Sequence, residues 1–425
     1  MSLIHTITIL VCLSAGFSYI NHRFIKLPLT IGLMAIALAM SLVLVALGKL
    51  GFGIESEATR FIRGIDFSEA LLHGMLSCLL FAGALHVDLS RLLDVKWIVG
   101  TLASVGVVLS ALITGFLGYY SFDLVGLPLP FIYCLLFGTL IAPTDPIAVM
   151  GILKAARLPK PLEIKIVGES LFNDGVGVAV FLVLLDLVHQ TSFSVVGTAT
   201  LFAEEAIGGA ALGWILGYVG YRMMKSVDNY QVEILITLAL VLGGFTLADV
   251  LHTSGPIAVV VAGLVIGNHG RQWAMSETTR EYIDNFWELV DELLNAVLFV
   301  LIGLELLVIS LQHQYVTAGL IAIPIVLLAR LLSVGLQVRV FSLVREFSEK
   351  TVALLTWGGL RGGISVALAL SLPQGETRDA IVTITYSVVV FSILVQGLTM
   401  GRLVQWAFQE TQAEGHLRSE VRGPG

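Results

Sequence analysis

Long apolar stretches alternate with short polar loops along the whole chain, and most of these stretches are long enough to cross a membrane. A helix needs about 20 apolar residues to span a bilayer. By that rule the sequence predicts thirteen spans, of which the ninth is short and the tenth begins with several acids at the membrane surface. The predicted spans are residues 3–20, 29–48, 67–87, 97–120, 128–150, 163–188, 196–222, 231–250, 254–268, 284–309, 316–344, 351–371 and 380–406.

The composition points to a membrane independently of these spans. Hydrophobic residues make up 56% of the chain and charged residues only 13%, whereas an average soluble domain has about 25% charged residues. The formal charge of −7 and the lack of a basic patch exclude a nucleic-acid partner. The three cysteines lie in apolar runs at unrelated spacings, which fits neither a zinc site nor a disulfide framework, and no cofactor is expected. We therefore expect an all-α polytopic protein embedded in the lipid bilayer.

Lysine and arginine are distributed unequally between the two sets of loops. With the N-terminus outside, Arg330 and Arg361 lie deep within spans, and most other cations fall on inner loops, on the span ends beside them or in the C-terminal tail. The outer loops hold only Lys49, Arg60, Arg63 and Arg378. Cytoplasmic loops carry an excess of cations. The pattern therefore predicts a multi-pass protein of the cell membrane with its N-terminus outside and its C-terminus in the cytoplasm.

An odd number of spans suggests two groups of six helices around a central one. The fifth span is interrupted by Pro143 and Pro146, because proline removes a donor and clashes with the preceding turn. The twelfth contains four glycines within residues 358–363. Broken helices at matching places in two inverted repeats, crossing near the midplane, are typical of a transporter's binding site. The predicted parts are a first repeat at about 1–188, a linking helix at about 196–222 and a second repeat at about 231–406, within one unit of 1–409 that is followed by a polar tail at 410–425.

The sixth span carries acids at a depth where charge is costly. An ionisable group there marks an ion path, a proton relay or an ion pair. Ser170 and Asp174 are four residues apart and share one helix face, and Glu169 and Asn173 share the adjoining face. The first face offers a hydroxyl and a carboxylate, which suit a hard monovalent cation. The second face suits a structural pair.

The interrupted fifth span supplies complementary groups. Unwinding at the two prolines would free backbone carbonyls near Thr144 and turn the Asp145 side chain inward, which is tolerated where a cavity is lined. Together with Ser170 and Asp174, these groups could replace part of the hydration shell of Na⁺. Carboxylates also bind protons, so one site can hold either the cation or a proton. This competition, joined to alternating access, is sufficient for antiport.

Two arginines within spans require buried partners. Arg330 is expected to pair with Glu169, which faces away from the proposed ion ligands. Arg361 is expected to cap carbonyls freed in the broken twelfth helix, where Gly359 and Gly362 soften the backbone. Further acids lie toward the ends of spans and are expected to face the membrane interface. These acids are Glu204, Glu205, Glu233 and Glu305.

These motifs resemble those of the NhaP-type sodium/proton antiporters of the monovalent cation/proton antiporter superfamily and, more distantly, of the animal sodium/proton exchangers. The resemblance runs from about residue 5 to residue 405. It implies a thirteen-helix inverted-repeat fold, a homodimer, and a core domain that moves against an interleaved dimerisation domain. The motifs that carry it are Ala142-Pro143-Thr144-Asp145-Pro146, the stretch from Gly168 to Gly175, Ala329-Arg330-Leu331 and Trp357-Gly358-Gly359-Leu360-Arg361-Gly362-Gly363.

The resemblance also implies roles for single residues. Asp174 would be the principal carrier of ion and proton, and Glu169 with Arg330 would be a stabilising ion pair. Asn173 stands where electrogenic relatives have a second Asp, which implies electroneutral one-for-one exchange, and we count it among the ion-binding residues. The third span reads Ala82 where some relatives have a glutamate, so a ligand from that helix is in doubt. The further ligands implied are Thr144 through its backbone, Asp145 and Ser170.

The leading hypothesis is a secondary antiporter, not an enzyme, that exchanges Na⁺ or Li⁺ for H⁺. The runner-up is K⁺/H⁺ exchange, because one sequence does not fix the cavity dimensions that discriminate cations. A cation channel is less favoured, since channels build acid rings by symmetry around a pore. A purely structural role is the alternative for three residues: Asp174 as a structurally paired acid, Asp145 as a helix cap and Ser170 hydrogen-bonded to its own helix.

Overall fold

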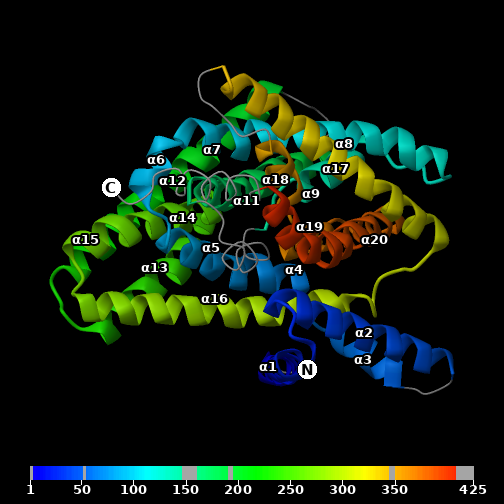
Figure 1. Ribbon diagram of the computed structural model, residues 1–425, viewed down its shortest axis with the longest axis horizontal. Coiled ribbons are helices and arrows are strands. Elements are labelled where there is room, and N and C mark those ends of the chain that lie inside the picture. The colour runs from blue at the N-terminus through cyan, green and yellow to red at the C-terminus, as the bar shows by residue number, and fades with distance from the viewer. Residues whose placement is uncertain (1–2, 51–53, 146–159, 190–194, 344–349, 408–425) are drawn as a thin grey trace, which may run out of the picture.

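The computed structural model describes residues 3–50, 54–145, 160–189, 195–343 and 350–407, and every regular element in these ranges is helical (Figure 1). Seven helical segments in them are long and apolar enough to cross a membrane, judged by length and composition. These are Ile4–Ile25, Leu29–Lys49, Lys96–Leu124, Ile164–Val188, Tyr230–Val250, His313–Phe341 and Glu376–Ala407. The all-α membrane fold predicted from the sequence is confirmed.

The predicted spans correspond to helices of two kinds. Those formed by one uninterrupted α-helix are α1 (Leu3–Ile20), α2 (Leu29–Lys49), α11 (Lys160–His189), α12 (Val195–Met224), α13 (Tyr230–Val250), α16 (Glu277–Glu305) and α17 (His313–Phe341). Others consist of consecutive pieces: α4 (Phe67–Glu69), η2 (Ala70–Met75) and α5 (Leu76–Leu85); α7 (Lys96–Ala103) and α8 (Val105–Leu124); α14 (Gly255–Val265), η3 (Ile266–Gly270) and α15 (Arg271–Trp273); α20 (Glu376–Phe391) and η4 (Ser392–Gln396). Short helices outside the predicted spans are η1 (Asn21–Ile25), α3 (Ile54–Arg63) and α6 (Leu89–Asp94).

The predicted interruption of the twelfth span is present. Helix α18 (Thr351–Trp357) ends just before the first of the four glycines, and α19 (Gly363–Leu370) begins at the last of them. Glycine has the greatest backbone freedom and the weakest helix propensity of the residues that retain an N–H, so a run of glycines ends a helix readily. The chain between the two halves is not helical.

The fifth span is interrupted as well. Helix α9 (Phe131–Ile141) ends just before Pro143, and the chain continues without helix through Asp145. Pro146 and the predicted second half of this span lie outside the described residues. The two interruptions touch, because the backbone N–H of Asp145 donates to the carbonyl of Leu360 at 2.7 Å. We call this contact between the two broken spans the crossing. In Figure 1, α9, α11, α18 and α19 meet near the middle of the molecule.

Glycines allow the helices around this crossing to approach closely. A Cβ at Gly177 of α11 would lie 2.2 Å from Cγ of Pro143, so only glycine lets the broken fifth span rest against α11. In the contact between α16 and α2, a Cβ at Gly303 would lie 2.5 Å from the Cβ of Ala37. The Ser41 hydroxyl donates to the Gly303 carbonyl at 2.9 Å across the same contact. Small residues and buried hydroxyls are the usual means of helix packing in a bilayer.

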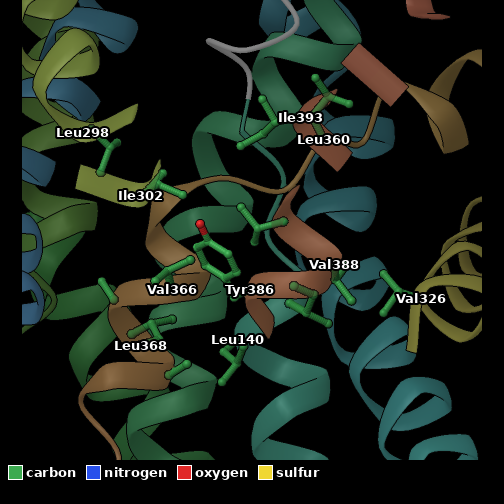
Figure 2. Close-up of a cluster of buried hydrophobic side chains, with 14 of the residues drawn as sticks. Leu140, Leu298, Ile302, Val326, Leu360, Val366, Leu368, Tyr386, Val388 and Ile393 are labelled. Atoms are coloured by element: carbon green, nitrogen blue, oxygen red, sulfur yellow. The ribbon is translucent and has the colours of Figure 1, made fainter. Parts of the chain in front are cut away.

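An apolar cluster beside the crossing holds both broken helices against their neighbours. Figure 2 shows its side chains packed together from several helices and from the break itself. The labelled members are Leu140 of α9, Leu298 and Ile302 of α16, Val326 of α17, Leu360 of the break, Val366 and Leu368 of α19, Tyr386 and Val388 of α20, and Ile393 of η4. The non-helical backbone is therefore enclosed by protein, which is the condition for tolerating it at membrane depth.

Candidate functional site

Helix α11 presents the predicted polar residues to the crossing within about one and a half turns. Glu169, Ser170, Asn173 and Asp174 are all buried, with exposed fractions between 0% and 5%. The 3.6-residue period of the helix gathers them on one side. Four polar groups, two of them acids, are thus withdrawn from solvent in a segment of membrane-spanning length.

The Thr144 side chain ties the broken fifth span to α11. Its hydroxyl lies 2.9 Å from the Ser170 hydroxyl and accepts from Nδ2 of Asn173 at 2.8 Å. Oδ1 of Asn173 in turn accepts from the Thr144 backbone N–H at 3.3 Å. Both ends of the Asn173 amide are therefore engaged with Thr144. The amide therefore positions Thr144 at the break, beside the predicted role of Asn173 as an ion ligand.

The Asp145 carboxylate occupies the space that a side chain at position 362 would need. A Cβ built on Gly362 would lie 2.1 Å from Oδ2 of Asp145 and 2.8 Å from its Cβ. Asp145 is only partly buried, whereas Asp174 is 5% exposed. The charges of Asp145 and Arg361 both act on the Asp174 carboxyl. Two carboxylates and one guanidinium thus share the crossing.

Arg361 holds the end of the interrupted fifth span. Its Nη1 donates to the carbonyls of Ala142 and Pro143, the latter at 2.8 Å, and its backbone N–H donates to the Ser392 hydroxyl at 2.9 Å. Arg361 is 2% exposed. Arg361 does cap freed carbonyls, but the prediction that they belong to the broken twelfth helix was wrong. The fold brings the end of the fifth span to this side chain, although Pro143 and Arg361 are 218 residues apart in the sequence. The order of residues alone does not predict that contact.

The predicted partner of Arg330 is present. Its Nη1 donates to Oε1 of Glu169, and its Nη2 donates to the Leu355 carbonyl at 3.3 Å. The two charged residues are 4% and 1% exposed. A Cβ at Gly359 would lie 2.9 Å from Nε of Arg330 and 3.1 Å from Cγ2 of Thr144, so the glycine makes room for both side chains. The pair joins α11, α17 and α18 beside the face of α11 that carries Ser170 and Asp174.

The sequence of the chain was compared with known proteins and matches a family. Residues 9–406 match the family model described as "Sodium/hydrogen exchanger, transmembrane". The chain belongs to the sodium/hydrogen exchanger family. It is 54% identical over 401 residues to the Na⁺/H⁺ antiporter NhaP of Pseudomonas aeruginosa, with 93% of this chain and 95% of that protein covered. It is 37% identical to the Na⁺/H⁺ antiporter NhaH of Halobacillus dabanensis, with 87% and 91% covered.

A solved structure supports the fold of this exchanger. The sodium proton antiporter MjNhaP1 from Methanocaldococcus jannaschii at pH 8 superposes with a TM-score of 0.73, covering 95% of this chain and 99% of that one. Identity between the two chains is 22%. The all-helical membrane fold expected from the sequence thus has a counterpart in a solved structure.

Two acids of the exchanger lie deeper than their sequence positions indicated. Glu233 of α13 is 0% exposed and Glu305 of α16 is 6% exposed, so the prediction that they face the membrane interface was wrong. Distance from a span end is a poor guide to burial, because neighbouring helices cover the ends as well as the middle. In the third span, Ala82 of α5 is buried in an apolar cluster, and it offers no oxygen to the crossing.

Proposed function

We propose that this exchanger is a secondary antiporter that moves Na⁺ one way and H⁺ the other through Asp174. The observation that carries the proposal is the contact between the broken fifth span and α11, where Thr144 touches Ser170 while Asp145 acts electrostatically on Asp174. Hydroxyl, carbonyl and carboxylate oxygens are the ligands that hard cations prefer. The names of its relatives, which are Na⁺/H⁺ antiporters, support Na⁺ as the cation.

Competition between the two substrates follows from the charges at the crossing. Asp145 and Asp174 repel one another when both are ionised, and the Arg361 guanidinium acts on Asp174 in the opposite sense. A bound Na⁺ or a proton on Asp174 relieves it, and each makes the other less favourable. Alternating exposure of the site to the two sides of the membrane then couples the two fluxes.

The stoichiometry that we propose is one Na⁺ for one H⁺. Asn173 carries no charge, and its amide holds Thr144 in place, which leaves Asp174 as the single carrier on α11. We further propose the arrangement predicted from the sequence, with a homodimer in the cell membrane, the N-terminus outside and the C-terminus in the cytoplasm. The inverted repeats and the moving core belong to the same proposal.

Purified protein in liposomes loaded with a pH-sensitive dye tests this function. We expect Na⁺ and Li⁺ gradients to move protons in the opposite direction, at rates that an imposed membrane potential leaves unchanged. Potential-dependent rates would contradict one-for-one exchange, and K⁺ as the preferred cation would establish the K⁺/H⁺ alternative. Cation uptake without proton movement would contradict antiport and favour a channel.

The space at Gly362 gives a prediction for the crossing itself. Gly362→Ala would push the Asp145 carboxylate away, because the new methyl group overlaps its Cβ, Cγ and Oδ2. Small displacements of reacting groups are costly, so we expect the exchange rate to fall by about tenfold or more. Gly243→Ala in α13 is the matched control, since a Cβ there meets nothing within 4 Å. Equal exchange rates for Gly362→Ala and Gly243→Ala would show that exchange does not depend on a fixed position of the Asp145 carboxylate.

A further inference from the structure

Helix α16 carries a polar stripe that begins about three turns into the helix and leads toward the crossing. Glu288, Asp291 and Asn295 follow one another at spacings of three and four residues, and therefore share a face. Glu288 is exposed, Asp291 is partly buried and Asn295 is 2% exposed. The stripe thus descends from solvent into the protein.

The same face of α16 reaches the broken twelfth helix. Leu298, seven residues beyond Asp291, fills the space beside Gly363, where a Cβ would lie 2.5 Å from its Cδ1. The adjacent Gly362 is where the Asp145 carboxylate rests. Figure 2 shows Leu298 and Ile302 in the same apolar cluster as Leu360 and Val366, which flank the break. Asp291 therefore lies about 10 Å along one helix face from the crossing.

The charge of Asp145 acts on the Asp291 carboxyl from the crossing. The charges of Glu288 and Glu292 act on it from the same helix. Asp145 in turn acts on Asp174. Three carboxylates from three separate segments therefore form a series in which Asp145 acts on both of the others.

Asn295 adds an unsatisfied oxygen to this series. Its Nδ2 donates to the Asp291 carbonyl at 2.8 Å, whereas its buried Oδ1 has no hydrogen-bond partner in the described part of the chain. Leaving a buried acceptor without a partner costs about 1–3 kcal/mol. Such a group in a native protein requires an explanation, and an ion bound for part of the transport cycle is one.

We propose that Asp291 and the amide oxygen of Asn295 form an access site for an alkali cation, from which the cation passes to Asp145 and then to Asp174. The inference rests on the proposed exchange and extends it to a further residue. The exposed Glu288 at the outer end of the stripe raises the local cation concentration. Asp291 and Asn295 then replace part of the hydration shell. By the orientation predicted from the cationic loops, this access site faces the cytoplasm.

The experiment compares four proteins in dye-loaded liposomes: the wild type, Asp291→Asn, Asp291→Glu and the exposed-neighbour control Glu292→Gln. Initial rates are measured against Na⁺ concentration at fixed pH and fixed ionic strength. We expect Asp291→Asn to raise the apparent KM for Na⁺ by about fivefold or more, with a maximal rate within about twofold of the wild type. Asp291→Glu should restore most of the affinity, and Glu292→Gln should leave it unchanged.

The outcomes separate this inference from the function on which it rests. A wild type that moves no protons in response to Na⁺ overturns the proposed function. If the wild type exchanges normally and Asp291→Asn has the same apparent KM for Na⁺ as the wild type, only the access site is overturned. If Asp291→Glu is as impaired as Asp291→Asn, the position matters for packing and not for charge. If added choline chloride erases the difference between wild type and Asp291→Asn, the carboxylate acts only by screened attraction at a distance, and the access site is likewise overturned.

Discussion

Asp174→Asn is expected to abolish exchange while leaving the protein folded. Asparagine keeps the size of the side chain but neither binds nor releases a proton near neutral pH, and it no longer balances a cation. Loss of a positioned proton carrier costs about 100-fold or more in rate. Because the substitution also removes repulsion from Asp145, we expect thermal stability to be equal to or higher than that of the wild type. The measurement is Na⁺-driven dye dequenching in liposomes, beside a melting curve of the same preparation.

Asp186→Asn is the matched control for this experiment. Asp186 lies on the same helix, twelve residues after Asp174, and is exposed. The same chemical change there is expected to leave the exchange rate within about twofold of the wild type. Normal exchange by Asp174→Asn would show that another group carries the proton, and the assignment of Asp174 would then be wrong.

Glu169→Ala is expected to produce the largest loss of stability among the site substitutions. It leaves the Arg330 guanidinium buried without its carboxylate, and breaking a buried pair from one side costs about 3–5 kcal/mol. The pair also joins α11 to α17, so local loosening is expected to spread to the crossing. We expect lower yield and a lower melting temperature, with the cation preference of the remaining activity unchanged.

Two companions of Glu169→Ala identify the cause of its effect. Glu57→Ala removes one partner of the exposed pair between Glu57 and Arg60, whose side chains are 70% and 74% exposed, and should change stability by less than about 1 kcal/mol. The double variant Glu169→Met with Arg330→Met removes both buried charges and should be more stable than Glu169→Ala. If the double variant is the less stable of the two, the pair contributes through more than compensation of charge.

The sequence was a good guide to the backbone of this exchanger. Hydropathy predicted the spans because a chain in lipid must satisfy its backbone internally, so every crossing segment becomes a helix. Proline and glycine predicted both interruptions, since their effects are local and do not depend on what surrounds them. Helical periodicity likewise placed Ser170 and Asp174 on one face of α11.

Contacts between helices were harder to predict. The pairing of Glu169 with Arg330 was predictable because few opposite charges lie within spans. The partners of Arg361 and Asn173, and the burial of Glu233 and Glu305, were not. In water, an apolar stripe marks the face of a helix that turns inward. In a bilayer the lipid-facing and protein-facing sides are both apolar, so the pattern says little about which helix a given residue meets.

The amino-acid sequence by itself therefore determined that this chain is a helical membrane protein, where two of its helices break, and which carboxylate of α11 has a hydroxyl on the same face. The tertiary structure alone decided what each break touches: Arg361 reaches the carbonyls of the fifth span, and Asn173 holds Thr144. The physical reason is the range of the forces involved. Helix formation and helix breaking depend on neighbours within a few residues, whereas a binding site at a crossing depends on segments brought together by packing.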